Sequence, residues 1–326
     1  MDTESTRASR RARTARMTPA TVVTWSLLVA ALVTNALLQP TFFTLYSVTS
    51  NLATFVPLVF AALAQAVVII GGGLDLSVGA ITALASVTAL TVMNGHDGLT
   101  PLGFAAALAT GTACGTLNGL VVGVLRLQPL IATFATASVF SGITLLVLPS
   151  PGGAVPPSMT AVYRMAVGPL PVPLLLIGVC LSVWVVLAAT VFMRHVKAVG
   201  SDAEAAYASL VPVTGVRVGT YAVCGAIASL AALAILANTG SGDPFIGANI
   251  ALDSIAACVL GGIALSGGRG SGPGAMAGAL ILSLTSNILF FVGVPTTFRQ
   301  LASGLVIIAA LALSVLSTRG GADRGN

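Results

Sequence analysis

Long apolar runs separated by short polar stretches make up almost the whole chain. Ten of these runs are close in length to the roughly 20 residues that a helix needs to cross a bilayer. They lie near residues 20–38, 51–70, 77–93, 102–124, 131–149, 172–193, 218–238, 250–265, 272–292 and 299–317. We therefore predict an all-α polytopic membrane protein with about ten transmembrane helices.

The composition excludes several other classes of protein. Of 326 residues, 56% are hydrophobic and only 7% are charged, whereas a soluble chain carries about 25% charged residues. A soluble enzyme, a secreted disulfide scaffold and a disordered regulator are thereby excluded. We expect one transmembrane domain over 20–317, with a basic cytoplasmic tail at 1–19, a cytoplasmic tail at 318–326 and no sizeable soluble domain.

The basic residues favour one orientation of these spans. If the N-terminus is inside, twelve of the 14 basic residues fall on the cytoplasmic side, and only Arg164 and Arg299 fall outside. This positive-inside bias supports ten spans with both termini cytoplasmic. The expected location is the plasma (inner) membrane of a bacterium, as a multi-pass protein whose basic tail can contact anionic lipid.

An internal repeat is visible at an offset of 162 to 169 residues. Because the matched spans, two to five and seven to ten, run in opposite directions, the pattern is typical of an inverted repeat. The matches are Asp75, Gly79–Ala80 and Leu84 with Asp243, Gly247–Ala248 and Leu252, then Asn118 with Asn287, and Ser141–Gly142 with Ser303–Gly304.

Small residues inside the spans indicate close helix packing. Glycine recurs every fourth residue from Gly111 to Gly123 and from Gly270 to Gly278, which lets another helix approach the bare backbone. Plain packing is favoured over a substrate groove. The four cysteines have no metal-ligand spacing and are interpreted as packing residues.

The residues needed for familiar chemistry are missing. Lys197 is the only lysine and does not follow glycine, so a phosphate-binding GxxxxGK[ST] loop is impossible. His96 and His195 have no partner at metal-ligand spacing. Only Asp75 and Asp253 are acidic residues near spans, whereas ion-coupled carriers keep carboxylates deep in the bundle. We expect no catalytic residue, metal or cofactor, no nucleic-acid partner, and an energy source outside this chain.

Three segments carry a family resemblance. Val68–Ala83 (VIIGGGLDLSVGAITA), Asn118–Thr136 and Leu252–Gly274 resemble landmarks of the ribose-type, or monosaccharide, permeases of ABC importers. The resemblance covers about residues 50 to 312. It implies a cytoplasmic ATP-binding subunit, an external solute-binding protein and a second permease subunit, identical or paralogous. The candidate signature or gate residues are Gly72, Gly73, Asp75, Ser77, Gly79, Asn118, Asp253 and Arg269.

The connection between spans six and seven, residues 194–217, is the candidate coupling loop. Ser201 or Asp202 can cap a short helix there, and Pro212 can end it. A helix parallel to the membrane would be a docking element, and a solvated turn is the alternative. The loop resembles the family's coupling helix, GxNxxAAxxSG[IV], with Asp202 in place of Asn and Leu210 in place of Gly. The candidate ATPase-coupling residues are Gly200, Asp202, Glu204, Ala205, Ala206 and Ser209.

Several assignments stay open. Asp75 is either a helix-start carboxylate, which is favoured, or part of a cytoplasmic gate. Arg269 could face lipid phosphate, the ATPase subunit or a cage of carbonyls. The outer segment 149–173 contains seven prolines, which favours an extended loop. With Met93–Pro101 and Gly240–Gly247, it is expected to frame an outer mouth that meets the solute-binding protein.

Two other functions compete with an importer subunit. A secondary carrier with an inverted repeat would move a small polar solute without ATP. A membrane-embedded enzyme is disfavoured because paired acids, metal spacing and an activated nucleophile are missing from the sequence. The substrate itself, whether ribose, another pentose, a hexose, a deoxy sugar or a polyol, is open.

Overall fold

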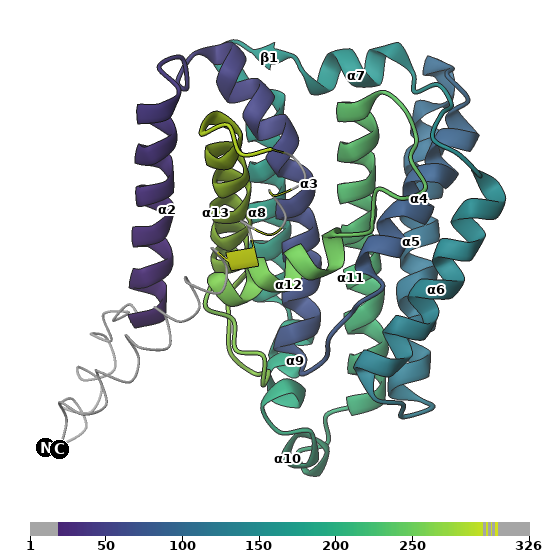
Figure 1. The fold of residues 1–326 in the computed structure, drawn as a ribbon. Helices are drawn as coiled ribbons and strands as arrows, with labels where there is room; N and C mark the ends of the chain where they lie inside the picture. The colour runs from purple at the N-terminus through teal and green to yellow at the C-terminus, as the bar shows by residue number, and fades with distance from the viewer. Residues whose placement is uncertain (1–18, 296–297, 299–300, 302–303, 306–326) are drawn as a thin grey trace, which may run out of the picture.

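The structure is a computed structural model, and it describes residues 19–295, 298, 301 and 304–305. Almost all of the tenth expected span, at 299–317, and nearly all of both tails lie outside the described residues. Within the described part, the chain is a bundle of long apolar helices (Figure 1). This confirms the prediction of an all-α polytopic membrane protein.

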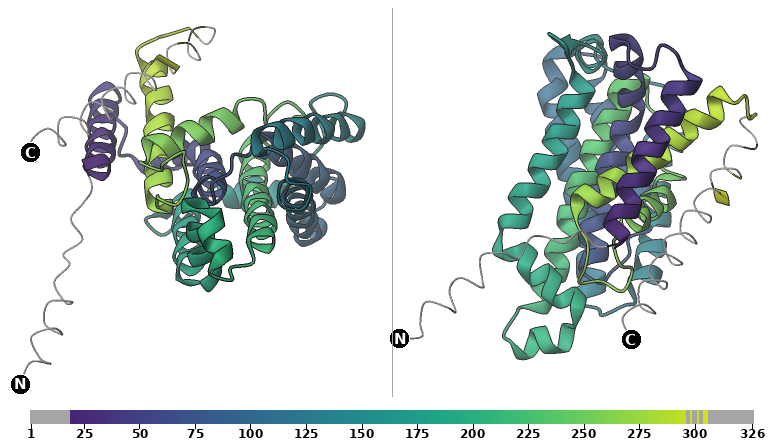
Figure 2. Two further views of the ribbon diagram at one scale, coloured as in Figure 1. Left: turned by 90° about the horizontal axis from the view of Figure 1, so that it is seen from below. Right: turned by 90° about the vertical axis from the view of Figure 1, so that its left-hand side faces the viewer.

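Seven helices in the described part are long and apolar enough to cross a membrane. They are α2 (Pro19–Leu38), α3 (Leu45–Ile70), α5 (Thr100–Gly123), α6 (Pro129–Val147), α8 (Val172–Ala189), α11 (Val213–Thr239) and α13 (Gly272–Phe291). The helix α3 is at the centre, because it packs against α8, α11, α12 and α13. Its second half, from Val59 to Ile70, is buried throughout. Figure 2 shows α2 at the edge of the bundle beside α13.

Two of the expected spans are much shorter than a membrane crossing. The helix α4 (Val78–Met93) has 16 residues and α12 (Ile250–Leu260) has 11, or about 24 and 16 Å at 1.5 Å per residue. Each follows a non-helical segment, 71–77 or 240–249, that leads from the end of a long helix back into the bundle. Helix α12 stops at Leu260, before the expected 265, because Gly262 adopts a left-handed φ of 79°.

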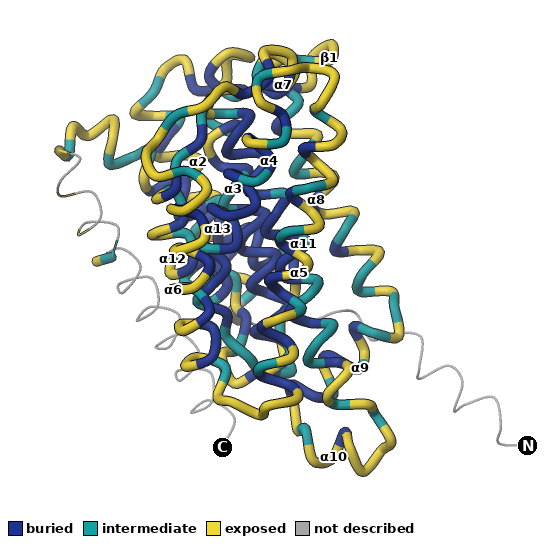
Figure 3. Tube along the Cα trace, turned by 90° about the vertical axis from the view of Figure 1, so that its right-hand side faces the viewer, coloured by how far each residue is buried: buried dark blue, intermediate teal, exposed yellow. Residues whose placement is uncertain are grey.

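The expected sixth span, 172–193, is also broken in the structure. Thr190 is extended, and its hydroxyl accepts a hydrogen bond from Met193 N at 3.2 Å. The chain therefore ends α8 at Ala189 and begins α9 (Val191–Ser201), which leads to α10 (Ala203–Ala208). Helices α9 and α10 project from one end of the bundle, as Figure 3 shows. We call this end of the bundle the α10 end.

The proline-rich segment lies at the opposite end, which we call the α7 end. It was expected to be extended, yet it contains the short helix α7 (Pro157–Tyr163), since a proline at the first helical position is already set for helix. It then forms a hairpin of β1 (Ala166–Val167) and β2 (Leu170–Pro171). Gly152 and Gly242 exchange two backbone hydrogen bonds of 2.9 Å, and Asp97 in the 3-10 helix η1 (Asp97–Leu99) accepts one from Ser158 N.

The glycine stripes lie where helices meet. A Cβ at Gly111 or Gly115 would collide with the carbonyl oxygen of Gly225 or Tyr221 in α11, so α5 packs backbone to backbone on that helix. In α13, Gly274 and Gly278 lie in the same way against Gly261 and α12. The four cysteines are buried and free. The stripes are thus sites of helix packing in the described part of the chain.

Candidate functional site

The helices α9 and α10 form an exposed element at the α10 end. In α9 the residues Met193, Val196, Val199 and Gly200 are buried against the bundle, while Arg194 and Lys197 are exposed. Asp202 is extended, with φ −162° and ψ 108°, and it separates the two helices. The chain therefore turns away from the bundle at this residue.

Of the two residues that the sequence offers as the cap of this helix, Ser201 and Asp202, it is Asp202 that caps α10. Its Oδ1 accepts hydrogen bonds from the backbone N–H groups of Glu204 and Ala205, both at 2.9 Å. Of the candidate coupling residues in this helix, Ala206 is buried and Glu204 and Ala205 are exposed; Ser209, which follows it, is also exposed. These groups form a small, largely exposed surface.

Leu210 ends this element in a conformation that explains the family's glycine. Its φ is +63°, in the left-handed region, which costs a side-chain-bearing residue about 1–2 kcal/mol. Its side chain is 92% exposed, and that of Tyr207 is 74% exposed. Two apolar side chains thus extend beyond the bundle at the α10 end. Pro212 does not end α10 but immediately precedes α11.

Three glycine-containing segments meet where α9 ends, and we call this contact the glycine junction: Gly72, Gly200, Gly267 and Gly268. The N–H of Gly268 donates to the carbonyl oxygen of Ile70 at 2.9 Å. A Cβ at Gly200 would collide with the same carbonyl oxygen, and a Cβ at Gly72 would lie 3.3 Å from Gly200 Cα. The candidate coupling residue Gly200 therefore contacts both the α3–α4 segment and the α12–α13 turn.

Asp75 is completely buried in the α3–α4 segment. Its Oδ1 accepts hydrogen bonds from Ser77 N at 2.8 Å and Ser77 Oγ at 2.6 Å, and Asn118 Nδ2 donates to Ser77 Oγ at 2.6 Å. The carboxylate thus supports Ser77, the residue before α4, rather than capping that helix itself. Cys224 Sγ lies 3.8 Å from the second carboxylate oxygen, Oδ2.

Three residues on neighbouring helices bond to the backbone of the α3–α4 segment around Asp75, and they were missed in the sequence analysis. The amide of Gln65, oriented to suit its neighbours, donates to Asp75 O at 3.1 Å and accepts from Asp75 N at 3.2 Å. Thr133 Oγ1 accepts from Leu76 N at 3.0 Å, and Tyr221 Oη donates to Leu74 O at 3.3 Å. Gln65 could have been found, since it is an amide inside a 26-residue apolar helix.

The other candidates are dispersed. Gly73 lies under the Tyr221 hydroxyl, and Gly79 packs backbone to backbone on Gly247. Arg269 is exposed in the α12–α13 turn, where its carbonyl accepts from Ala264 N at 3.2 Å. Asp253 is partly exposed in the first turn of α12. The structure thus forms one junction and one buried network from these residues.

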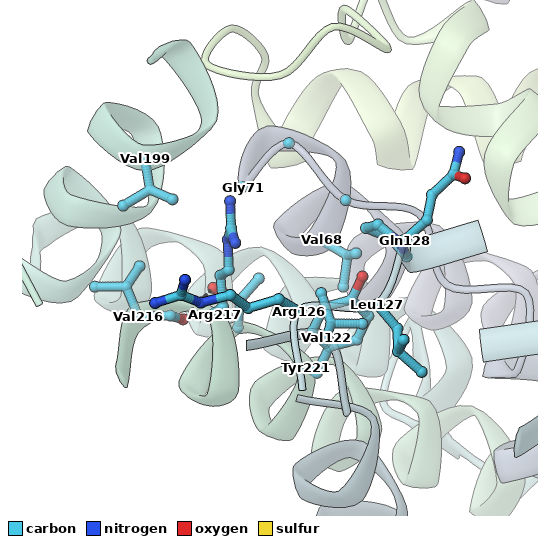
Figure 4. Close-up of a pocket in the computed structure, with 14 residues that line it drawn as sticks. Val68, Gly71, Val122, Arg126, Leu127, Gln128, Val199, Val216, Arg217 and Tyr221 are labelled. Carbon is cyan, nitrogen blue, oxygen red and sulfur yellow. Dashed lines mark hydrogen bonds between the residues drawn. The ribbon is translucent and has the colours of Figure 1, made fainter. Parts of the chain in front are cut away.

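A pocket of about 220 Å³ that contains two arginines lies beside the glycine junction, and no pattern in the sequence indicates it. Figure 4 shows Arg126 and Arg217 extending along it, with Val199 of α9 and Tyr221 of α11 in its wall. Within the described residues, neither guanidinium forms an ion pair. The pocket therefore presents uncompensated positive charge next to the coupling element.

Known proteins resemble this chain over most of its length. A family model described as a branched-chain amino acid transport system permease component matches residues 47–311. The ribose import permease protein RbsC of Escherichia coli K12 is 33% identical over 295 residues, which are 87% of this chain and 91% of that protein. No solved structure has significant similarity to the chain.

Two further relatives are named for other solutes. The fructose import permease protein FrcC of Rhizobium meliloti is 33% identical over 307 residues, covering 90% of this chain and 85% of that protein. The autoinducer 2 import system permease protein LsrD of Escherichia coli HS is 29% identical over 294 residues, covering 88% and 89%. The similarity therefore extends over nearly full-length import permeases.

Proposed function

Since the chain belongs to the family of transport-system permease components, we propose that it is the membrane-spanning subunit of an ABC importer for a monosaccharide. The observation that carries the proposal is the exposed α9–α10 element, whose Gly200 contacts the connecting segments of both halves of the bundle. An external motor that moved this element would act on both segments at once. No step of covalent chemistry is assigned to this chain.

The coupling surface proposed for the ATP-binding subunit is the exposed side of α10. Gly200 and Ala206 attach it to the bundle, Asp202 caps it, and Glu204, Ala205 and Ser209 present its surface. The exposed side chains of Tyr207 and Leu210 add apolar contacts of the kind that interfaces bury.

The proposed topology has ten spans, with the α10 end in the cytoplasm. In the described part, Arg126, Arg194, Lys197, Arg217 and Arg269 all lie toward the α10 end, while Arg164 lies at the α7 end. This distribution is the positive-inside bias. It supports both a bacterial plasma-membrane location and cytoplasmic termini.

An inverted repeat is supported by contacts between matched residues. Gly79 and Gly247 lie backbone against backbone, as expected of equivalent residues beside a two-fold axis. The matched aspartates also form the same local hydrogen bond: each Oδ1 accepts from the backbone N–H two residues further along the chain, at 2.8 Å. The donors are Ser77 N for Asp75 and Phe245 N for Asp243. The half-helices α4 and α12 then both begin close to the Gly79–Gly247 contact.

The proposed substrate is a hydroxyl-rich small molecule, because the relatives are named for import of ribose, fructose and autoinducer 2. The α7 end, where Gly152 pairs with Gly242, is the proposed contact for an external solute-binding protein. A second permease subunit would complete the assembly within the lipid bilayer.

Reconstitution tests this function directly. Proteoliposomes holding this chain with its ATP-binding subunit should take up a labelled monosaccharide only when ATP and the binding protein are both present. Uptake by the chain alone would instead establish a secondary carrier. A catalytic turnover by the isolated chain would favour the membrane-embedded enzyme.

The coupling surface has its own test. Ala205→Glu adds charge to the exposed side of α10, and Gly98→Glu adds it to open space at the α7 end. We expect the first variant to lower co-purification of the ATP-binding subunit at least tenfold and the second to leave it unchanged. Equal co-purification of both variants would place the ATP-binding subunit elsewhere.

A further inference from the structure

The outward face of α12 carries polar and apolar side chains at membrane depth. Ala251, Ser254, Ala257 and Cys258 face the bundle and are buried. On the other side, Leu252 is 64% exposed, Asn249 is exposed, and Asp253 is partly exposed. Figure 1 shows α12 crossing the front of the bundle at mid-height.

A hydrogen bond to the central helix sets the depth of this face. Cys258 Sγ donates to Ala62 O at 3.2 Å, and Ala62 lies eight residues, or about 12 Å, from the end of α3 at Ile70. All of α3, 26 residues, is about 39 Å long, and the hydrocarbon core of a bilayer is about 30 Å thick. Asp253 therefore lies at the level of the acyl chains.

A carboxylate that faces acyl chains is strongly disfavoured, so such residues face protein or a water-filled cavity. Asp75, an acid of the α3–α4 segment, is buried and its carboxylate accepts hydrogen bonds. The carboxylate of Asp253 has no hydrogen-bond partner among the described residues. Its place on the outward face calls for a polar neighbour there, which is water, a polar solute or further protein.

We propose that the outward face of α12, residues 249, 252, 253 and 256, lines the aqueous path for the solute, and that the Asp253 carboxylate accepts hydrogen bonds from sugar hydroxyl groups. A carboxylate offers acceptor sites on two oxygens, which suits adjacent hydroxyls. The identity of the solute rests on the proposed function. The aqueous path rests on burial and depth alone.

Cysteine accessibility tests the path. Leu252→Cys is compared with Leu181→Cys on α8. Leu181 is 42% exposed. Its depth is similar, because the thiol of the neighbouring Cys180 contacts Val59 O in α3. The four native cysteines are buried, so the wild-type chain gives the background. With the negatively charged, membrane-impermeant reagent methanethiosulfonate ethylsulfonate, we expect position 252 to react at least ten times faster than position 181. Equal rates would show that lipid or other protein, including residues 299–317, covers α12, and would overturn the path.

Transport kinetics test the sugar contact. In the complete complex, Asp253→Asn should raise the KM at least fivefold for whichever sugar of a labelled panel the wild type imports, with the amount of protein in the membrane unchanged. Asp253→Glu should recover part of this loss. A KM within twofold of wild type in Asp253→Asn would overturn the contact. If the wild type imports no sugar of the panel, the proposed substrate class and the sugar contact both fail, while the labelling ratio still decides the path.

Discussion

The glycine junction makes Gly200→Ala the most informative single substitution in this protein. The added methyl group would collide with Ile70 O and would lie 2.8 Å from Gly268 N. These two atoms form the 2.9 Å hydrogen bond that joins the α3–α4 segment to the α12–α13 turn. Because the obstacles are backbone atoms, no side chain can rotate to make room.

The expected cost follows from two effects. Inserting a methyl group into a packed region costs about 1–3 kcal/mol, and loss of the hydrogen bond adds about 0.5–1.5 kcal/mol. We expect the complex to be destabilised by about 1.5–4.5 kcal/mol in total. The strain lies between α9 and both the α3–α4 segment and the α12–α13 turn. We therefore expect the rate of sugar uptake to fall by a larger factor than the rate of ATP hydrolysis, so that less sugar is taken up per ATP.

Proteoliposomes give both rates, and a thermal unfolding scan of the detergent-solubilised complex gives the stability. The matched control is Gly215→Ala, near the start of α11, because a Cβ there would meet no atom within 4 Å. It should keep wild-type coupling. If Gly200→Ala keeps both wild-type stability and the wild-type ratio of uptake to hydrolysis, the junction is not the tight contact described above.

Three smaller changes test neighbouring features. Asp202→Ala removes the cap of α10 and should cost about 1 kcal/mol, seen as faster amide exchange at residues 204 and 205; unchanged exchange would contradict the cap. Leu210→Gly should relieve about 1–2 kcal/mol of left-handed strain and slow proteolysis of this loop, while faster cleavage would argue against that strain. Gly111→Ala should destabilise the α5–α11 contact by about 1–3 kcal/mol. The control is Gly142→Ala, whose Cβ would meet nothing within 4 Å and which should not destabilise the protein. Thermal unfolding distinguishes the two variants, and equal unfolding midpoints would refute the close packing.

Much of the bundle could be predicted because its causes are local. Apolar runs and the spacing of glycines reflect burial and close approach, and both are written in consecutive residues. The cap at Asp202 is equally local, since its carboxylate bonds to N–H groups two and three residues on. Even the departure at Leu210 was informative, because the structure places that residue where glycine is favoured.

The remaining features depend on contacts between distant parts of the chain. Hydropathy does not distinguish a half-helix such as α12 from a full span, since both are apolar. Gly72, Gly200 and Gly267 meet through their backbones, and no side-chain pattern marks such a meeting. Asp75 lies three residues before α4, and the amide of Gln65 that bonds to its backbone comes from the preceding helix, α3.

The back-to-back arrangement of the half-helices has an electrical consequence. Each helix N-terminus carries about half a positive charge, and α4 and α12 begin on either side of the Gly79–Gly247 contact. Asp75 lies just before the first of these helices and Asp253 in the first turn of the second, so each positive end has its own negative charge nearby. The positive and negative ends of a whole helix cancel, so movement of either half-helix would carry the charge of its carboxylate through the membrane field. We expect solute uptake at fixed ATP to depend on the membrane potential in so far as α4 or α12 moves across the membrane with its carboxylate.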